Sequence, residues 1–229
     1  MTMGDASVTE SVSCDALIDG RLGDHRRSAH PTSVHGWVER GSELPNSGTH
    51  FGFVLAGSAR LACSSGEFSV HQGMYFAAPG AVSVTGGRGL IVTRHEFGGV
   101  FHLGGPIEGA GRLQYIDGCS DSLLIPPTAW GDPCLNLLYV PPHTKQTEHT
   151  HPSLRVGVIA SGEGICRTPQ RDHPLRPGVV FQLPADHRHC FHTSTSPLTI
   201  VAFHPDSDFG PTDDNHPMLN RTVIPPARD

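Results

Sequence analysis

The 229-residue sequence predicts an all-β protein of two tandem β-barrels with an arm at each end of the chain. Glycine (27) and proline (20) make up about a fifth of the residues, which suits short strands between tight turns and disfavours helix interiors. Short apolar runs bounded by Gly, Pro or Ser recur in two sets, without a sustained 3.6-residue stripe. These runs are 50–57, 59–63, 73–80 and 89–97, then 135–142, 154–162, 178–185 and 197–205.

The two sets of runs repeat each other at a constant spacing. Gly57 and Gly162 are 105 residues apart (162 − 57), and Gly73 and Gly178 have the same separation. Pro79 and Pro184 follow it too. Turn-forming residues held at one offset inside similar apolar frames indicate an internal duplication.

The duplication divides the chain into five parts. We expect an N-terminal arm over 1–30, a first barrel over 31–105, a connector with one strand at most over 106–131, and a second barrel over 132–205. Residues 206–229 are acidic and turn-forming, and form either a lid or dimer-exchange arm or a solvated tail. The edge strands of such barrels need cover, which a homodimer or the N-terminal arm would supply.

Charge and composition exclude several classes of partner. The formal net charge is −6 without a run of five basic residues, so nucleic acid is not an expected partner. No apolar run is long enough to span a bilayer, and the first residues do not resemble a secretory signal. The six cysteines form no CxxC pair, so we expect a cytoplasmic protein with reduced thiols and no membrane partner.

Histidines in the second barrel have the spacing of a metal site. His149 and His151 alternate along one expected strand and therefore share a face. A second expected strand returns with His187 and His189. Imidazoles that converge from neighbouring strands suit a divalent transition metal with positions left open for substrate.

These histidines resemble the two motifs of the cupin superfamily. One motif has a His-x-His pair, then a Glu and a Gly-containing turn, and here His149 and His151 precede the turn at Gly162. The other has Gly, five residues, Pro-x-Gly, two residues and His, and here Gly178 and Pro184 precede His189. The resemblance implies two jelly-roll-like cupin barrels, a bicupin, with His149, His151 and His189 as metal ligands.

The sequence departs from these motifs at two positions. Arg155 stands where the family has its Glu, and Asp186 replaces the glycine of the Pro-x-Gly step. Because arginine stays protonated, the site is expected to hold its metal with three histidines only. Arg155 either points into the cavity, where its fork would bind a substrate carboxylate, or tilts outward to a surface acid. Glu148 has the opposite strand parity to the ligands.

The first barrel lacks the ligand set. The offset of 105 maps His149, His151, Arg155 and His189 onto Leu44, Asn46, His50 and Val84 in turn. A lone histidine is more often packed or solvated than a ligand. We therefore expect the first barrel to be degenerate and free of metal.

Three functions fit this sequence. Resemblance to three-histidine cupins favours an Fe(II) dioxygenase that acts on a small organic acid or an enolisable carbonyl compound. Arg155 would orient the substrate, and Tyr139 or His187 would donate a proton if it faces the cavity. The first alternative is a metal-dependent isomerase, lyase or cyclase that uses His187 or Glu148 as base, and the second is a non-catalytic ligand-binding or sensor protein. Zn, Mn, Ni and Cu are alternatives to iron.

Overall fold

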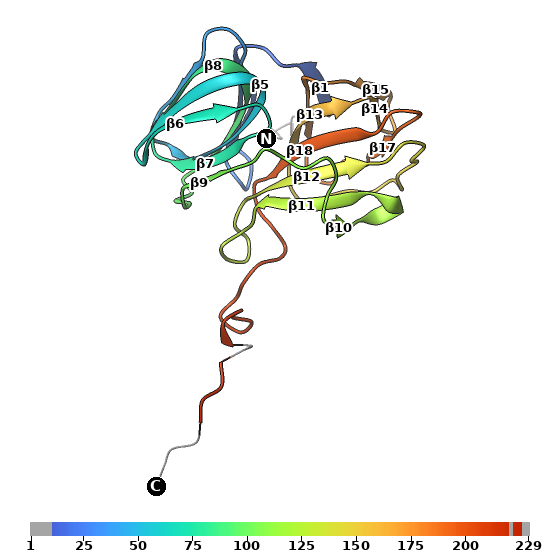
Figure 1. Ribbon diagram of the computed structural model, residues 1–229. Coiled ribbons are helices and arrows are strands. Elements are labelled where there is room, and N and C mark those ends of the chain that lie inside the picture. Colours follow the sequence, from blue (N-terminus) through green and yellow to red (C-terminus); the bar gives the residue numbers. More distant parts are fainter. Residues whose placement is uncertain (1–10, 220–221, 226–229) are drawn as a thin grey trace, which may run out of the picture.

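A computed structural model describes residues 11–219 and 222–225, which form two β-sheet units side by side (Figure 1). The predicted all-β class is confirmed. Within the described residues the one helical element is the short 3-10 turn η1 (Ile116–Gly118), and no helix is long and apolar enough to cross a bilayer.

The first unit is one antiparallel sheet of eight strands. Its strands run in the order β2-β3-β8-β5-β7-β9, with β4 paired to β8 and β6 paired to β5. The strands are β2 (Gly20–His25), β3 (Thr32–Trp37), β4 (Ser42–Leu44), β5 (Gly48–Cys63), β6 (Gly66–His71), β7 (Tyr75–Pro79), β8 (Val82–His95) and β9 (His102–Gly104).

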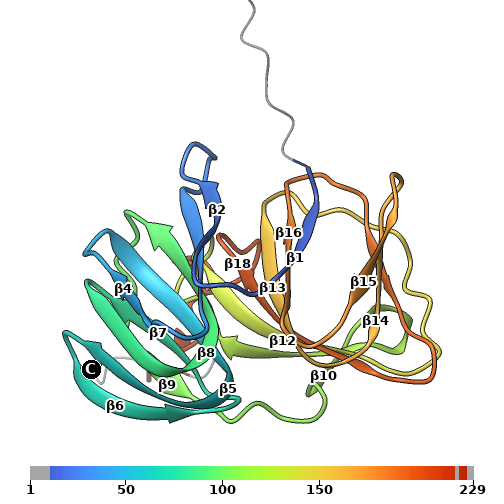
Figure 2. The same cartoon turned by 90° about the horizontal axis from the view of Figure 1, so that it is seen from above.

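The second unit contains a seven-stranded sheet, ordered β1-β16-β13-β18-β12-β11-β10, and a three-stranded sheet, ordered β15-β14-β17 (Figure 2). Apolar side chains from both sheets form a common core, including Ile159, Cys166, Phe181 and Phe191. The strands are β1 (Ser13–Ala16), β10 (Leu113–Gln114), β11 (Ser120–Ile125), β12 (Cys134–Val140), β13 (Arg155–Gly162), β14 (Gly164–Arg167), β15 (Asp172–Leu175), β16 (Val179–Leu183), β17 (Cys190–His192) and β18 (Leu198–His204).

The arm and the connector carry more structure than the sequence indicated. Strand β1 lies in the expected arm but pairs with β16, so the N-terminal segment covers the edge of the second unit. Strand β2, in the same arm, pairs with β3 of the first unit. The connector contributes both β10 and β11 to the sheet beside β12. These segments lack apolar runs because most of their side chains are at least partly exposed, and their backbone hydrogen bonds give no sequence signal.

The offset of 105 reproduces the strand register of the two units. His50 on β5 pairs with Ala78 on β7, and Arg155 on β13 pairs with Leu183 on β16. Both members of each pair shift by the same 105 residues. Gly57 and Gly162 have φ angles of +76° and +80°, the left-handed conformation that glycine adopts without strain.

One close packing contact is also duplicated. Gly52 on β5 lies under the ring of Phe76, and Gly157 on β13 lies under the ring of Phe181. A Cβ atom built on Gly157 would come within 2.2 Å of Cζ of Phe181. The glycines are therefore required because the neighbouring strand places an aromatic ring directly over the backbone.

Another apolar core joins the two units. Phe51 on β5 packs against Phe203 on β18, with ring centroids 4.9 Å apart. Val156 and Val158 on β13 belong to the same buried cluster. The seven-stranded sheet is thus covered on its outer face by the first unit, while its inner face is left for the second unit's own core and cavity.

Substituting Gly157→Ala is expected to lower the free energy of unfolding by about 1–3 kcal/mol, because the added methyl group must displace the buried ring of Phe181. Gly98→Ala is the matched control, since a Cβ atom there meets no atom within 4 Å. Urea denaturation followed by circular dichroism measures both. Equal stability of the two variants would contradict the packing role of Gly157.

Acid is expected to destabilise the first unit through His35 on β3. Burial, followed by the charge of Arg21, lowers the pKa of His35 to about 4 from its ordinary value of 6.5. The folded protein therefore holds this imidazole neutral, and stability is lost as pH falls from 6.5 towards 4, by up to about 1.4 kcal/mol per pH unit. Urea titrations at pH 7 and pH 5 should show a smaller loss for His35→Gln than for the natural protein. An identical loss in both proteins would exclude this contribution.

Candidate metal centre

A two-residue backbone bridge brings two of the predicted ligands together. The amide of His149 donates to the carbonyl of His189 at 3.0 Å, and the amide of His189 donates back at 3.0 Å. The sequence predicted a strand at His149, and this prediction was wrong. The segment of His149 makes only isolated bridges, at Lys145 and at His149. The bridge nevertheless sets the two imidazoles beside each other, with ring centroids 4.6 Å apart.

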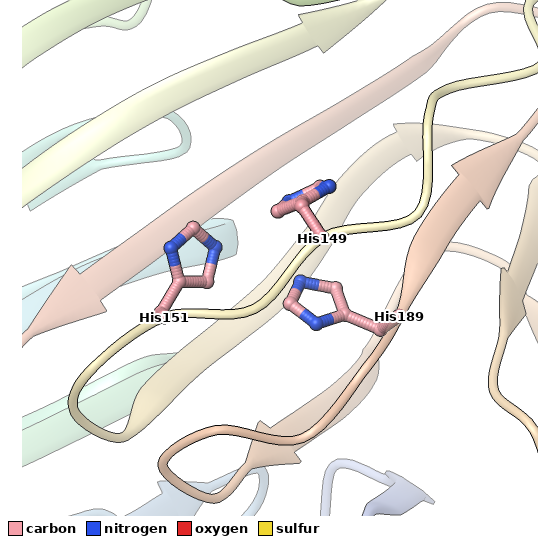
Figure 3. A group of neighbouring side chains, drawn as sticks. All are labelled: His149, His151 and His189. Carbon is pink, nitrogen blue, oxygen red and sulfur yellow. The ribbon is translucent and has the colours of Figure 1, made fainter.

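His151 completes a group of three imidazoles that face one another (Figure 3). One nitrogen from each ring lies within 4.8 Å of the nitrogens of the other two. Among the described residues this is the one group of three or more potential ligands with such geometry. The carbonyl of His151 accepts a hydrogen bond from the amide of Asp186 at 2.7 Å, which fixes the end of the segment.

Asp186 explains one departure from the motif. It has φ +61°, in the left-handed region where glycine is the relaxed residue. Aspartate is among the residues that tolerate this conformation. The turn between Pro184 and His189 therefore keeps the shape that a glycine would give, and His189 still reaches the cavity.

Hydrogen bonds orient two of the rings. Nδ1 of His149 lies 2.8 Å from the carbonyl oxygen of Thr147, and Nδ1 of His189 lies 3.0 Å from that of His187. A carbonyl accepts only from a protonated Nδ1, so both rings carry their proton there and leave Nε2 with a free lone pair. This is the tautomer that a metal ligand needs.

The protein also keeps two of the imidazoles uncharged. Burial, and then the charge of Arg155, lowers the pKa of His151 to about 3. Burial lowers the pKa of His189 to about 4. Both rings are therefore neutral at pH 7, and neutral imidazole is the form that binds a metal ion. The three histidines fit a divalent transition metal by donor type and spacing, and His149 and His189 fit it by tautomer as well.

A clamp from the connector holds the segment before His149. Asp117, in η1, accepts a 2.6 Å hydrogen bond from the amide of Thr147 and a 3.2 Å bond from its hydroxyl. Thr147 in turn supplies the carbonyl that faces Nδ1 of His149. Gln146 fixes the same segment to β17, because its Oε1 accepts from the amide of Phe191 at 3.0 Å. Neither clamp was expected from the sequence.

The histidines open into a cavity of about 580 Å³. Phe181, Leu183 and Ile200 supply apolar walls, and the polar lining includes Arg155 and His204. The C-terminal extension contributes to the lining at its start, through Asp208 and Phe209.

Arg155 lies in this cavity, which decides between its two expected positions. Its side chain is 8% exposed and starts β13 on the inner face of the sheet. Nη1 donates to Ser153 Oγ at 2.6 Å and to two backbone carbonyls, and Ser153 donates onward to Asp206. Among the described residues, Nε is buried without a partner and Nη2 donates no hydrogen bond. The Nε–Nη2 edge, which suits a carboxylate, is therefore unpaired within the protein.

Three other predicted residues do not reach the cavity. Tyr139 is next to Leu138 on β12, and Leu138 lines the cavity, so strand alternation turns Tyr139 to the other face. His187 does not line the cavity, and its Nδ1 lies 3.1 Å from the carbonyl of Ala185. Glu148 lies outside as well, in an exposed ion pair with Arg188 at 3.4 Å. Roles for these side chains in substrate chemistry have no geometric basis.

His204 is a cavity residue that sequence reasoning did not single out. It ends β18, and its ring centroid lies 6.3 Å from that of His151. Burial, and then the charge of Arg155, lowers its pKa well below the ordinary value, so the ring is neutral. Strand alternation with Ala202 and Ile200, which also line the cavity, was the available signal.

The first unit has a different group at the position of Arg155. His50 is fully buried, with Nδ1 2.8 Å from Oγ1 of Thr93 and Nε2 3.1 Å from the carbonyl of Pro45. Both ring nitrogens are therefore engaged in structural hydrogen bonds. Within the described residues no metal-ligating group of three lies in this unit.

Comparison with protein families identifies the second unit. Residues 136–204, which span β12 to β18 and contain all three histidines, match the family model described as "Cupin domain". The second unit of the chain therefore contains a cupin domain. A comparison with curated protein sequences finds no match.

Several solved structures share the fold of the chain at low identity. A cupin 2 conserved barrel domain protein from Leptotrichia buccalis is similar at TM-score 0.56 and 12% identity, covering 89% of this chain and 91% of that one. Protein Ylba from E. coli gives 0.56 and 17%, covering 87% and 85%. Salicylate 1,2-dioxygenase from Pseudaminobacter salicylatoxidans gives 0.53 and 11%, covering 76% and 70%.

Removing the Asp117 clamp is expected to weaken metal binding to the cupin site about 10-fold, because His149 loses the support that orients its ring. Competition of Asp117→Ala against a chromophoric chelator, with Zn²⁺ as the probe, measures this affinity. Asp213→Ala is the control, an exposed acid of the C-terminal extension. Unchanged Zn²⁺ affinity in Asp117→Ala would show that the clamp has no part in the site.

Proposed function

We propose that the protein is a metal-dependent bicupin enzyme, an Fe(II) dioxygenase that acts on a small organic acid or an enolisable carbonyl compound. The bicupin organisation is supported by the shared register of β5 with β7 and of β13 with β16 at one offset. In this proposal the first barrel is degenerate and acts as the support of the second.

The observation that carries the proposal is the juxtaposition of three imidazoles and an unpaired guanidinium edge in one cavity. His149, His151 and His189 would hold the metal. With three protein ligands, a bound ion supplies Lewis-acid or redox chemistry at positions left open for substrate and dioxygen. Iron is favoured, and Zn, Mn, Ni or Cu would use the same donors.

Arg155 would orient the substrate. Its Nε–Nη2 edge would donate two parallel hydrogen bonds to a carboxylate, or to the enolate oxygen of a carbonyl substrate. Burial of the guanidinium strengthens such bonds, because little water competes for them. The apolar walls at Phe181 and Ile200 would keep water from the reacting carbon atoms.

The name of one structural neighbour supports the oxygenase reading. Salicylate 1,2-dioxygenase acts, by its name, on an organic acid, although at 11% identity it is similar to this chain in fold alone. An isomerase or lyase would need a base beside the substrate, and the two candidates expected for that role, His187 and Glu148, do not line the cavity.

Elemental analysis of protein purified without added metal tests the site first. About one transition-metal ion per chain is expected, and a His149→Ala/His189→Ala double variant should lose it, because only one ligand remains. An oxygen electrode then tests the Fe(II)-loaded protein against a panel of small carboxylic acids and β-diketones, with the double variant as control. If neither the natural protein nor the double variant takes up metal on reconstitution, the proposal is contradicted. Stoichiometric metal without oxygen uptake would favour a lyase or a binding protein.

A further inference from the structure

A second polar site lines the cavity on a different wall from the histidines. Asp121 on β11 and Asn136 on β12 belong to the seven-stranded sheet, whereas His189 leads into β17 of the three-stranded sheet. Both side chains are cavity-lining. Neither residue lies in the motifs that resemble the cupin family.

Asp121 is an acid without a cation. Its side chain receives hydrogen bonds only from Nδ2 of Asn136, at the long distances of 3.3 and 3.5 Å, and makes no ion pair with a described residue. Burial raises its pKa, which shows that the surroundings disfavour the negative charge. A partly buried carboxylate in this state costs stability unless a ligand supplies what the protein does not.

One side-chain atom of Asn136 also lacks a hydrogen-bond partner among the described residues. It is 8% exposed, its Nδ2 is directed to Asp121, and its Oδ1 has no partner among the described residues. The two side chains are not needed to hold β11 to β12, because the backbone ladder already pairs Asp121 with Leu138 and Leu123 with Asn136. Together they leave acceptor oxygens without a donor in this part of the cavity wall, where Oδ1 of Asn136 is itself buried.

Arg155 has the opposite need, because the donors of its Nε–Nη2 edge have no acceptor among the described residues. Burial lowers the pKa of Arg155, and the acids that oppose this shift are Asp206 and Asp208 rather than Asp121. Arg155 and Asp121 are therefore a cation and an acid of the same cavity lining that form no ion pair with each other. A ligand with a single charged end would satisfy only one of them.

We infer that Asp121 and Asn136 bind a protonated amine, so that the substrate is an amino acid in the broad sense, with its carboxylate on Arg155. An ammonium group offers three N–H donors to the oxygens of Asp121 and Asn136 and neutralises the carboxylate, which a hydroxyl group does not. This inference rests on the proposed function and assigns its substrate class.

Matched ligand pairs test the inference by isothermal titration calorimetry on Zn²⁺-loaded protein. Each pair exchanges an ammonium for a methyl group on the same skeleton: β-alanine against butyrate, 4-aminobutyrate against pentanoate, 5-aminopentanoate against hexanoate, and alanine against isobutyrate. At least one amino acid should bind 10-fold or more tightly than its alkyl partner. Asp121→Asn should abolish that preference and leave the affinity for the alkyl carboxylate unchanged.

Two further variants separate the outcomes. Asp208→Asn removes the other acid of the cavity wall, and it should keep the preference for the amine. Loss of the preference in Asp208→Asn instead of Asp121→Asn would overturn the assignment. Arg155→Gln should weaken every carboxylate. Carboxylate binding that depends on Arg155 but shows no preference for an amine in the natural protein would overturn this inference and leave the proposed function standing. The absence of binding by any carboxylate would contradict the proposed role of Arg155 itself.

Discussion

The apolar core between the two units is the constraint on which the site depends. Val156 and Val158 face this core, so the residues between and before them on β13 must face the other way, into the second unit. A slip of one residue would expose valines to the cavity and drive Arg155 into the apolar cluster. The core thus determines which side chains of β13 face the cavity. Burial of the two valines sets the register of the strand, and this register places Arg155 in the cavity.

The same constraint gives the first unit a structural role beside the metal site. Its strand β5 covers the outer face of β13 and β18 through Phe51 and its neighbours. Without it, a large apolar face of the cupin domain would be exposed to water. The first unit therefore supports the sheet that carries Arg155 by packing against the face opposite the cavity. In the first unit the position equivalent to Arg155 is occupied by His50, and both of its ring nitrogens make hydrogen bonds.

The sequence predicted those features that depend on local periodicity. The His149-x-His151 spacing and the return at His189 indicated that three imidazoles would meet, because alternation along an extended segment is a property of neighbouring residues even where the segment forms only isolated bridges. The offset of 105 anticipated the paired registers for the same reason. Apolar runs also located β12, β13, β16 and β18.

Other features depend on contacts that leave no local trace. The face of Tyr139 was undecidable because β12 is apolar on both sides, so its pattern carries no alternation. Asp117 acts on Thr147 across 30 residues through a turn. The sequence around Asp121 and Asn136 has no distinctive pattern. Their binding role follows from the fold, which places no cation beside Asp121 and no hydrogen-bond donor beside Oδ1 of Asn136 among the described residues.

The pairing of β1 with β16 has a consequence for how the chain is made. Ser13 lies opposite Gln182, 169 residues later in the sequence, and their side chains are in contact at 3.3 Å. At a synthesis rate of about 5–20 residues per second, the first strand leaves the ribosome on the order of ten seconds or more before its partner exists. The first unit has all of its strands by then and can fold, but the sheet that carries Arg155 stays open at one edge until late in translation. The N-terminal strand thus belongs to the sheet of the second unit, although the whole first unit lies between them in the sequence. A cut between the two units would therefore separate the second unit from its edge strand β1.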